Sequence, residues 1–305
     1  MILSLALLLA PTSPLPDAAL PASAVPPATI CARALQGADE PERLEAWPKL
    51  EDAALAKREV ARLRKARTEE MGAQAHAALV ELGAGCAPLL MTVVEKEKGS
   101  EARARAVAVL ELVTDARHTR LIAEGFTSRS ASLRTWSLGR TAAFPDPGLQ
   151  AAAESALTAA RKRKAKKGEE EELDAERRAA ALAATASGSL DGLPELTALA
   201  RDDWGDWGSA VRTALEGARG PEASAAVVAT LAGERRGTVA GLRLLAGCGD
   251  ASALAAVGQH LDSSDNSIRI EAINACRGIV DGDPPLARLS AFEAIEVAKK
   301  WKGRL

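Results

Sequence analysis

The feature that most constrains this chain is a helix boundary that recurs about every 30 residues, a period typical of repeat proteins. At each boundary an apolar stretch ends, and an Asp or Gly precedes a second stretch of helix-forming residues. The boundaries are Gly85, Asp115, Asp146, Asp191, Gly220, Asp250 and Asp281. The intervals between them are nearly equal, except for a longer one from Asp146 to Asp191. A unit of this length cannot bury a core alone, so each unit has to stack on its neighbours. The sequence therefore predicts a repeat protein.

The residues at these boundaries favour the start of a helix. Asp is a good N-cap because its carboxylate accepts the unpaired backbone N–H groups of the first turn. Pro147 and Pro221 follow two of the boundaries, at the first helical position, where the missing N–H group of proline has no cost. Ser290 and Glu293 have the spacing of a capping box. Helices are therefore expected to begin at a fixed period.

The stretches between boundaries have helical periodicity. In residues 254–261 the apolar side chains of Leu254, Val257 and Leu261 share one face, and residues 268–279 repeat this pattern. Hydrophobic residues make up 47% of the chain but aromatic residues only 3%, and Tyr is absent. Alanine and leucine, which are strong helix formers, supply most of the apolar content. We therefore expect an all-α fold of helical hairpins.

The string SIRIEAINACRGIVDGDPPLARL, residues 267–289, resembles HEAT repeats. Their second helix carries a V-R-x-x-A-x-x-A-L pattern that is followed by Asp. Arginines lie at one constant distance before three of the boundaries, at the position of the HEAT arginine: Arg103, Arg134 and Arg269. The resemblance covers residues 70–300 and implies a right-handed α-solenoid of about seven HEAT-like helical hairpins, an armadillo-type fold. In that family the arginine supports hydrogen bonds between repeats. The units that end at Asp191, Gly220 and Asp250 lack it, so looser stacking is expected there.

The N-terminus predicts export. Residues 2–10 are one apolar run, too short to span a bilayer, which needs roughly 20 helical residues, but typical of a secretory signal. No Lys or Arg precedes the run, and the best small-residue cleavage site is Ala22–Ala24. We predict a signal peptide over 1–24, a Pro/Ala-rich flexible segment over 25–45 and a repeat solenoid over 46–305. The protein is then exported to the periplasm, cell envelope or extracellular space, without stable membrane insertion, because no later segment looks long and apolar enough. The alternative is an intracellular adaptor whose apolar run is a gene-start artefact.

The one long interval contains a charged segment over 160–177. A basic run, Arg161–Lys167, is followed by an acidic run, Gly168–Glu176. We interpret it as an extended hairpin whose basic and acidic arms pair with each other. A basic handle for nucleic acid or phosphoinositide is the alternative, but the acidic run would neutralise it. The formal net charge of −2 also argues against a nucleic-acid partner.

Motifs of catalysis are absent from the sequence. The three histidines, His76, His118 and His260, lie in different repeats, and none precedes a Glu. Deoxyhypusine hydroxylase, an enzyme built from HEAT repeats, binds iron through His-Glu pairs, so that activity is excluded. No HExxH, GxSxG or phosphate-loop motif occurs. We expect no catalytic residue, metal or cofactor. A lyase-type enzyme on a HEAT-like solenoid is the alternative, by fold analogy alone.

The four cysteines show no zinc-ligand spacing. Alignment of the last two boundaries places Cys248 opposite Ile279 and Cys276 opposite Leu245, which are core positions. These two cysteines are therefore expected to be small buried hydrophobic residues. A disulfide between Cys31 and Cys86 is left open.

Two sets of residues are candidates for partner binding. Trp204 and Trp207 are predicted to lie in the turn over 202–209, where they could anchor an interface or fill a gap between units. The second set is a series of arginines on the second helices, in pairs seven or eight residues apart: Arg212 and Arg219, Arg236 and Arg243, Arg269 and Arg277. On stacked units these pairs would form adjacent rows on a concave surface. Structural or solvated arginines are the alternative.

The sequence therefore favours a non-catalytic, protein-binding scaffold. A surface of arginines would suit an acidic protein segment or another anionic polymer, because the guanidinium group binds carboxylates at two points. The identity of the partner and the oligomeric state do not follow from the sequence.

Overall fold

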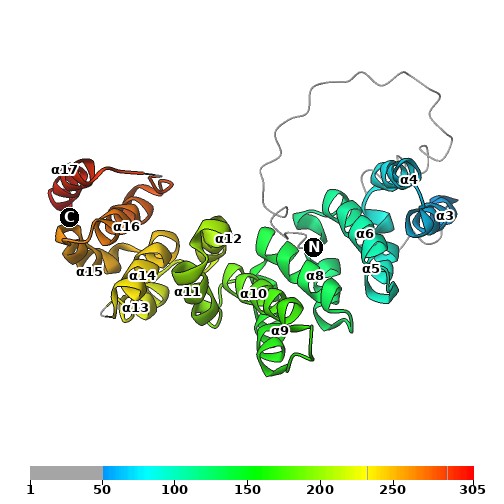
Figure 1. Ribbon diagram of the computed structural model, residues 1–305, viewed down its shortest axis with the longest axis horizontal. Helices are drawn as coiled ribbons and strands as arrows, with labels where there is room; N and C mark the ends of the chain where they lie inside the picture. Colours follow the sequence, from blue (N-terminus) through cyan, green and yellow to red (C-terminus); the bar gives the residue numbers. More distant parts are fainter. Residues whose placement is uncertain (1–50, 232, 287) are drawn as a thin grey trace, which may run out of the picture. The chain divides into compact units, whose positions relative to one another are not determined.

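The computed structural model describes residues 51–231, 233–286 and 288–305, without the side chains of residues 51 and 52. Over these ranges the chain forms helices and turns and no β-strand (Figure 1). The predicted all-α class is therefore confirmed. The predicted signal peptide over 1–24 and the segment over 25–45 lie outside the described residues.

The chain divides into two compact units. The first comprises the residues up to Leu121 together with Ser128–Leu133, and the second comprises Ile122–Thr127 and Arg134–Leu305. Two helices contain residues of both units, α7 (Thr119–Ala123) and α8 (Ala131–Ala143). Each unit is described by itself.

The first unit contains two helical hairpins. Its helices are α3 (Glu51–Lys65), α4 (Glu69–Leu82), α5 (Ala87–Lys96) and α6 (Ser100–Val113), with the 3₁₀ helix η3 (Gly83–Cys86) between α4 and α5. Helix α3 packs against α4 and α5 against α6, while α6 also contacts α3 and α4. Fully buried leucines, including Leu63, Leu79, Leu90 and Leu110, fill the spaces between them. Each hairpin thus buries one face against the other.

Residues 69–96 form the one stretch of the described chain that is long and apolar enough to cross a membrane. The expectation that no later segment meets this criterion was therefore wrong. The stretch is not one straight helix, because Gly83 has a φ of +73° between α4 and η3. Half of its most apolar window is buried inside the fold. Its buried apolar side chains form part of the core of the two hairpins.

The second unit contains the remaining helices. They are α9 (Gln150–Lys162), α10 (Glu170–Ala186), α11 (Leu193–Asp202), α12 (Trp204–Gly217), α13 (Pro221–Val228), α14 (Arg235–Cys248), α15 (Leu254–Gly258), α16 (Asn266–Cys276) and α17 (Ala291–Lys302). Its short 3₁₀ helices are η5 (Glu124–Thr127), η6 (Pro147–Leu149), η7 (Ala251–Ala253) and η8 (Gln259–Asp262), and a π-helical segment, η9 (Arg277–Asp281), follows α16. The 3₁₀ helix η4 (Ala116–His118) belongs to the first unit.

Consecutive helices of the second unit pack as hairpins, α9 with α10, α11 with α12, α13 with α14 and α15 with α16. The second helix of each hairpin also packs on the next one, so that α10, α12, α14 and α16 form a row (Figure 1). Helix α17 covers α16 at the end of this row. The buried side chains form one continuous cluster, from Phe126 to Trp301, rich in alanine and leucine.

Several predicted helix starts are confirmed. Asp115, Asp146 and Asp250 are N-caps whose carboxylates accept the backbone N–H group two residues later. Pro147 and Pro221 occupy first helical positions.

The last predicted cap is confirmed as well, since Ser290 and Glu293 form a capping box. Three boundaries differ from the prediction. Gly85 lies inside η3, and Cys86 precedes α5. Gly192 rather than Asp191 precedes α11, and Asp281 ends η9. Both aspartates lie one or more residues outside the following helix.

Glycines near the ends of the second helices allow close packing. A glycine lies three residues before each of the last four boundaries: Gly188, Gly217, Gly247 and Gly278. A Cβ atom on Gly217 would lie 2.0 Å from the Ala186 carbonyl oxygen, and one on Gly278 would lie 2.1 Å from the Ala246 carbonyl oxygen. Neighbouring helix backbones therefore touch at these points. The expectation of looser stacking in these units was wrong, because glycine achieves the close approach without the HEAT arginine.

The predicted packing role of Cys248 and Cys276 is confirmed, since both side chains are fully buried. Burial raises the pKa of the Cys248 thiol to about 12 and that of Cys276 to about 11. Cys86 is also fully buried, and its thiol lies 3.0 Å from the Gly83 carbonyl oxygen. Cys31 lies outside the described part of the chain.

Candidate partner-binding surface

Both candidate tryptophans lie on the first turn of α12 and not in the turn before it, because α12 begins at Trp204. Their side chains are half-buried and pack against the core cluster. A Cβ atom on Gly208 would lie 2.9 Å from the Trp204 ring, so this glycine leaves room for the indole. The tryptophans thus fill gaps beside α12 and keep part of each ring at the surface.

Two arginines lie over the ring of Trp204. The guanidinium carbon of Arg243, on α14, is 5.1 Å from the ring centroid, and that of Arg212, on α12, is 5.4 Å away. Arg243 is engaged elsewhere as well, since it donates to Glu271 Oε1 at 2.9 Å and to the Ala200 carbonyl oxygen at 2.7 Å. Arg243 therefore connects α11, α14 and α16 around the indole.

Arg212 makes no hydrogen bond or ion pair with the described residues. Its side chain is half-buried, and burial lowers the pKa of its guanidinium group, an effect that the field of Glu271 opposes. A charge that loses hydration without gaining an acceptor is unfavourable. The donors of Arg212 are thus available to an anionic group from outside.

Arg178, on α10, repeats this arrangement at the second tryptophan. Its guanidinium carbon lies 5.4 Å from the centroid of Trp207. Its Nε atom is buried and has no hydrogen-bond partner, and the side chain forms no ion pair within the described ranges. Arg178 was missed from the sequence because no second arginine lies seven or eight residues from it to form a pair. Trp204, Trp207, Arg178, Arg212 and Arg243 together are called the tryptophan–arginine surface below.

Arg219, just beyond the C-terminal end of α12, has a different environment. Its Nε atom donates to the Gly247 carbonyl oxygen at 3.1 Å, and Nη2 donates to the Gly278 carbonyl oxygen at 3.2 Å. These two glycines belong to the next two units along the row. Arg219 therefore holds three successive second helices together.

The other three candidate arginines lie apart from this surface. Arg236 is exposed, and its field helps to lower the pKa of Asp202, after the larger effect of Arg201. Arg269 donates to the Ser263 carbonyl oxygen at 2.6 Å, and Arg277 forms an ion pair with Asp283 at 2.9 Å.

The six arginines therefore have different partners, and their predicted arrangement in rows stays a prediction. Only Arg212 and Arg243 meet, at Trp204. A spacing of seven or eight residues put each pair on one side of its helix, but the acceptors around each side chain differ.

The arginines at the HEAT position also differ among themselves. Arg103 donates to Ser132 of a later helix at 3.0 Å. Arg134 donates to both carboxylate oxygens of the buried Glu176, at 2.8 and 2.7 Å. Arg269 makes local contacts only. Hydrogen bonds between hairpins are thus present at two of these three positions.

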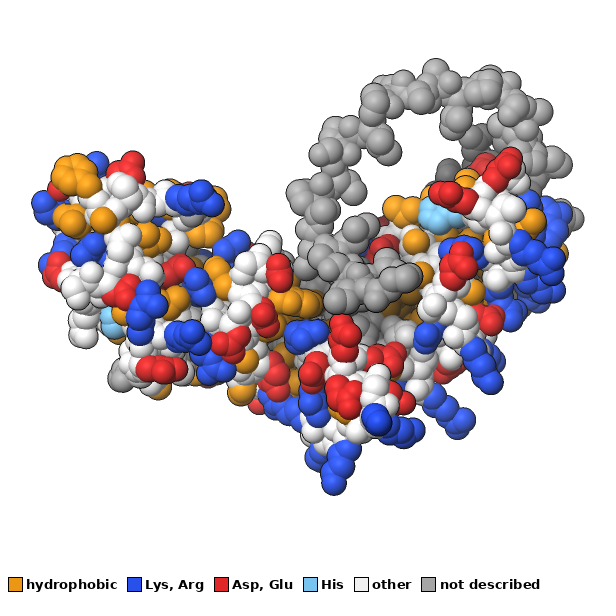
Figure 2. Space-filling view, viewed as in Figure 1, with side chains coloured by type: hydrophobic (Ala, Val, Ile, Leu, Met, Phe, Trp, Pro, Cys, Tyr) orange, Lys and Arg blue, Asp and Glu red, His pale blue; other side chains and the backbone are white. Residues whose placement is uncertain are grey.

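The extended charged hairpin over 160–177 corresponds to the end of α9, the start of α10 and the turn between them. Pairing across the hairpin is confirmed where Arg163 meets Glu176. Arg177 adds a hydrogen bond to the Arg163 carbonyl oxygen at 3.0 Å, while Arg161 pairs with Glu195 of α11. Basic and acidic side chains lie side by side at this tip (Figure 2).

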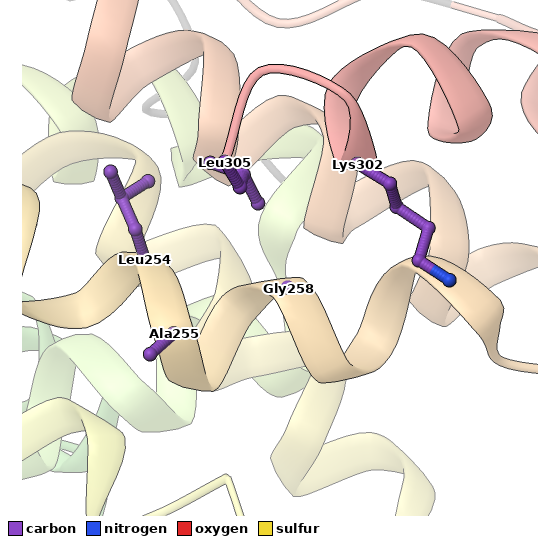
Figure 3. Close-up of a pocket in the computed structure, with 5 residues that line it drawn as sticks. All are labelled: Leu254, Ala255, Gly258, Lys302 and Leu305. Carbon is purple, nitrogen blue, oxygen red and sulfur yellow. The ribbon is translucent and has the colours of Figure 1, made fainter.

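A shallow apolar cavity of about 270 Å³ lies between α15 and the end of α17. It is lined by Leu254, Ala255, Gly258, Lys302 and Leu305 (Figure 3). Lys302 is the one charged side chain in the lining. In the part of the chain that the structure describes, no group of three or more His, Cys, Asp or Glu side chains is placed to hold a metal ion.

Comparisons with protein-family models, with curated proteins and with solved structures find no match to this chain. The resemblance to HEAT repeats thus stays a prediction from the sequence. Function has to be inferred from the surfaces of the fold, among which the tryptophan–arginine surface has the most unusual environment.

Proposed function

We propose that this chain is a non-catalytic scaffold that binds a partner protein on a right-handed, HEAT-like α-solenoid of about seven helical hairpins. The row of second helices α10, α12, α14 and α16 supports the proposal, because stacking of this kind presents an extended surface. The close backbone contacts at Gly217 and Gly278 support it as well, since a rigid row can hold a partner without rearranging.

The observation that carries the binding role is the pair of half-buried guanidinium groups, Arg178 and Arg212, that lie on tryptophan rings without an acceptor. A carboxylate would supply that acceptor, and a charge-assisted pair with arginine can be two-pronged. The half-exposed indoles add apolar contact area of the kind that anchors interfaces. We infer that the partner presents an acidic segment.

The spacing of the two arginines fits an extended segment. Arg178 and Arg212 lie on α10 and α12, which pack directly, so their axes are roughly 8–10 Å apart. An extended chain rises about 3.3 Å per residue. Acidic side chains on one extended segment that crosses both helices are therefore expected to meet the two guanidinium groups.

Nearby acidic residues restrict the direction of approach. Asp203 and Asp206 are exposed at the start of α12. At about 100° per residue, Asp206 lies roughly 200° around the helix from Trp204, so it points away from that ring. An acidic segment would thus lie over Arg178 of α10 and Arg212 of α12, and avoid the side of α12 that carries Asp206.

A fluorescently labelled Glu-rich peptide tests this binding role by anisotropy. The wild-type chain should bind it, with affinity that falls as salt is added, and should not bind the matched Gln-rich peptide. The double variant R178Q/R212Q should lose most of the affinity. The control R236Q removes an exposed charge outside the surface and should bind like wild type.

Equal loss of affinity in R178Q/R212Q and in R236Q would mean that net charge alone attracts the peptide, and would contradict the proposed site. Circular dichroism of each variant confirms that its helical content is retained.

Export to the periplasm, cell envelope or extracellular space is part of the proposal. It rests on the apolar run over 2–10 and the small residues at Ala22–Ala24. N-terminal sequencing of the secreted fraction should find a chain that starts near Val25. A full-length chain in the cytosol would favour the intracellular adaptor instead.

A further inference from the structure

Helix α17 has one buried face and one unusually apolar outer face. Ala294, Ala298 and Trp301 are buried in the core. Phe292 is 73% exposed and Ile295 is 38% exposed, and Phe292 is the most exposed of the large hydrophobic residues in the described ranges. Hydrophobic side chains are visible on the outer surface of α17 (Figure 2). An aromatic ring in water is conspicuous in a chain with so few aromatic residues.

The outer residues of α17 form one stripe. Phe292, Ile295, Lys299 and Lys302 follow one another at intervals of three, four and three residues. This is the spacing with which one helix packs along another. The two lysines can cover apolar groups with their aliphatic stems while their ammonium groups stay in water. The stripe is therefore suited to contact with a second helix.

The cavity lies at the end of this stripe. Lys302 and Leu305 line it from the α17 side, and Leu254, Ala255 and Gly258 line it from α15 (Figure 3). The cavity is open to solvent and has a volume of about 270 Å³, so an apolar side chain from outside can approach it. Phe292 of the same chain lies ten residues from Lys302 along the helix, roughly 15 Å away.

The charges on α17 are polarised along its length. Glu293 and Glu296 lie in its first half, whereas Lys299, Lys300 and Lys302 lie in its second half. Within one chain Lys299 pairs with Glu296, and Lys302 pairs with Asp262, so part of this charge is already compensated. Two such helices attract each other when antiparallel, because each acidic half then faces a basic half. A parallel pair would oppose like charges. The helix is thus complementary to itself under a two-fold rotation.

We propose that α17 is a self-association surface, on which α17 of a second copy lies antiparallel and each Phe292 enters the cavity of the other chain. With the two-fold axis crossing the stripe midway between Phe292 and Lys302, Phe292 faces the second copy's Lys302 and Ile295 faces the second copy's Lys299. A 12-residue helix offers a small contact, so the dimer is weak and concentration-dependent. This interface shares no residue with the tryptophan–arginine surface.

Sedimentation velocity of the full chain over a concentration series tests the proposal. The wild-type protein should shift from monomer toward dimer as its concentration rises. F292K should stay monomeric, because it places a like charge against the second copy's Lys302. L112K is the matched control, because Leu112 is 64% exposed on a different helix, α6. It should associate like wild type. A wild-type chain that stays monomeric at its solubility limit, or F292K that still dimerises, would overturn the proposal.

Cysteine cross-linking tests the antiparallel direction in a Cys31→Ser background. A mixture of F292C and K302C chains should form a disulfide between the two different chains. F292C alone should not, because the two substituted positions would be about 15 Å apart along the axis, beyond the roughly 7 Å limit between Cα atoms. Efficient cross-linking of F292C to itself would refute the antiparallel pair.

Discussion

Two neighbouring arginines of this part of the chain are used in opposite ways. Just beyond the C-terminal end of α12, Arg219 donates to two backbone carbonyl groups, those of Gly247 and Gly278. Within α12, Arg212 lies on Trp204 and finds no acceptor in the described residues. An arginine side chain is thus available to a partner when no nearby backbone carbonyl group accepts its N–H donors. Residue type and position on the helix face do not by themselves determine whether an arginine is available.

The largest loss of stability is expected where a buried, hydrogen-bonded arginine loses its carboxylate acceptor. Glu176→Ala would leave Arg134 buried without its two-point partner and remove the contact with Arg163. Breaking a buried pair in this way costs about 3–5 kcal/mol of unfolding free energy. Urea denaturation followed by circular dichroism measures it.

The matched control is Glu171→Ala on the same helix, where the side chain is exposed. It should change the free energy of unfolding by less than about 0.5 kcal/mol. Similar losses in the two variants would mean that the buried pair has no special role.

The next largest effect concerns the close contacts at the C-terminal ends. Gly217→Ala places a methyl group against the Ala186 carbonyl oxygen, where backbone has to move. We expect a loss of about 1–3 kcal/mol in the free energy of unfolding. Gly205→Ala on the same helix meets nothing within 4 Å and should stabilise the protein by up to about 1 kcal/mol, since alanine is the better helix former.

Both glycine variants are compared by their urea midpoints. If both substitutions change the free energy of unfolding in the same direction, the close backbone contact at Gly217 has no special role in the packing of the second helices.

The smallest effect is expected at the exposed caps. A side-chain hydrogen bond from Arg117 lowers the pKa of Asp115 to about 2, and one from Arg235 lowers that of Asp265 to about 2. Because both values are lowered on folding, these carboxylates stabilise the fold above their ordinary pKa near 4, and the contribution is lost as the pH falls through about 2.

Thermal midpoints of wild type and Asp115→Asn should therefore differ slightly at neutral pH and converge in acid. A difference that grows on acidification would have the wrong sign. Solvent screening at these exposed sites keeps the effect small.

Local signals in the sequence predicted the hairpins, the caps at Asp115, Asp146 and Asp250, and the burial of Cys248 and Cys276. These features depend on nearest neighbours along the chain or on period alone. The environments of the arginines could not be predicted in this way. Arg219 reaches backbone carbonyl groups, whereas Arg212 reaches only the indole ring of Trp204. This difference depends on how adjacent units stack. The glycines three residues before each of the last four boundaries were a usable signal, since they recur at a fixed position and allow that stacking.

The most direct measurement compares Arg219→Met with Arg212→Met, each for its free energy of unfolding and its affinity for the Glu-rich peptide. Arg219→Met should lose about 1–3 kcal/mol of stability, because two charge-assisted hydrogen bonds to backbone disappear, and should bind the peptide like wild type. Arg212→Met should keep its stability within about 0.5 kcal/mol and bind the peptide about tenfold more weakly. If Arg212→Met is the destabilised variant, or if both variants bind like wild type, the division between structural and partner-binding arginines is wrong.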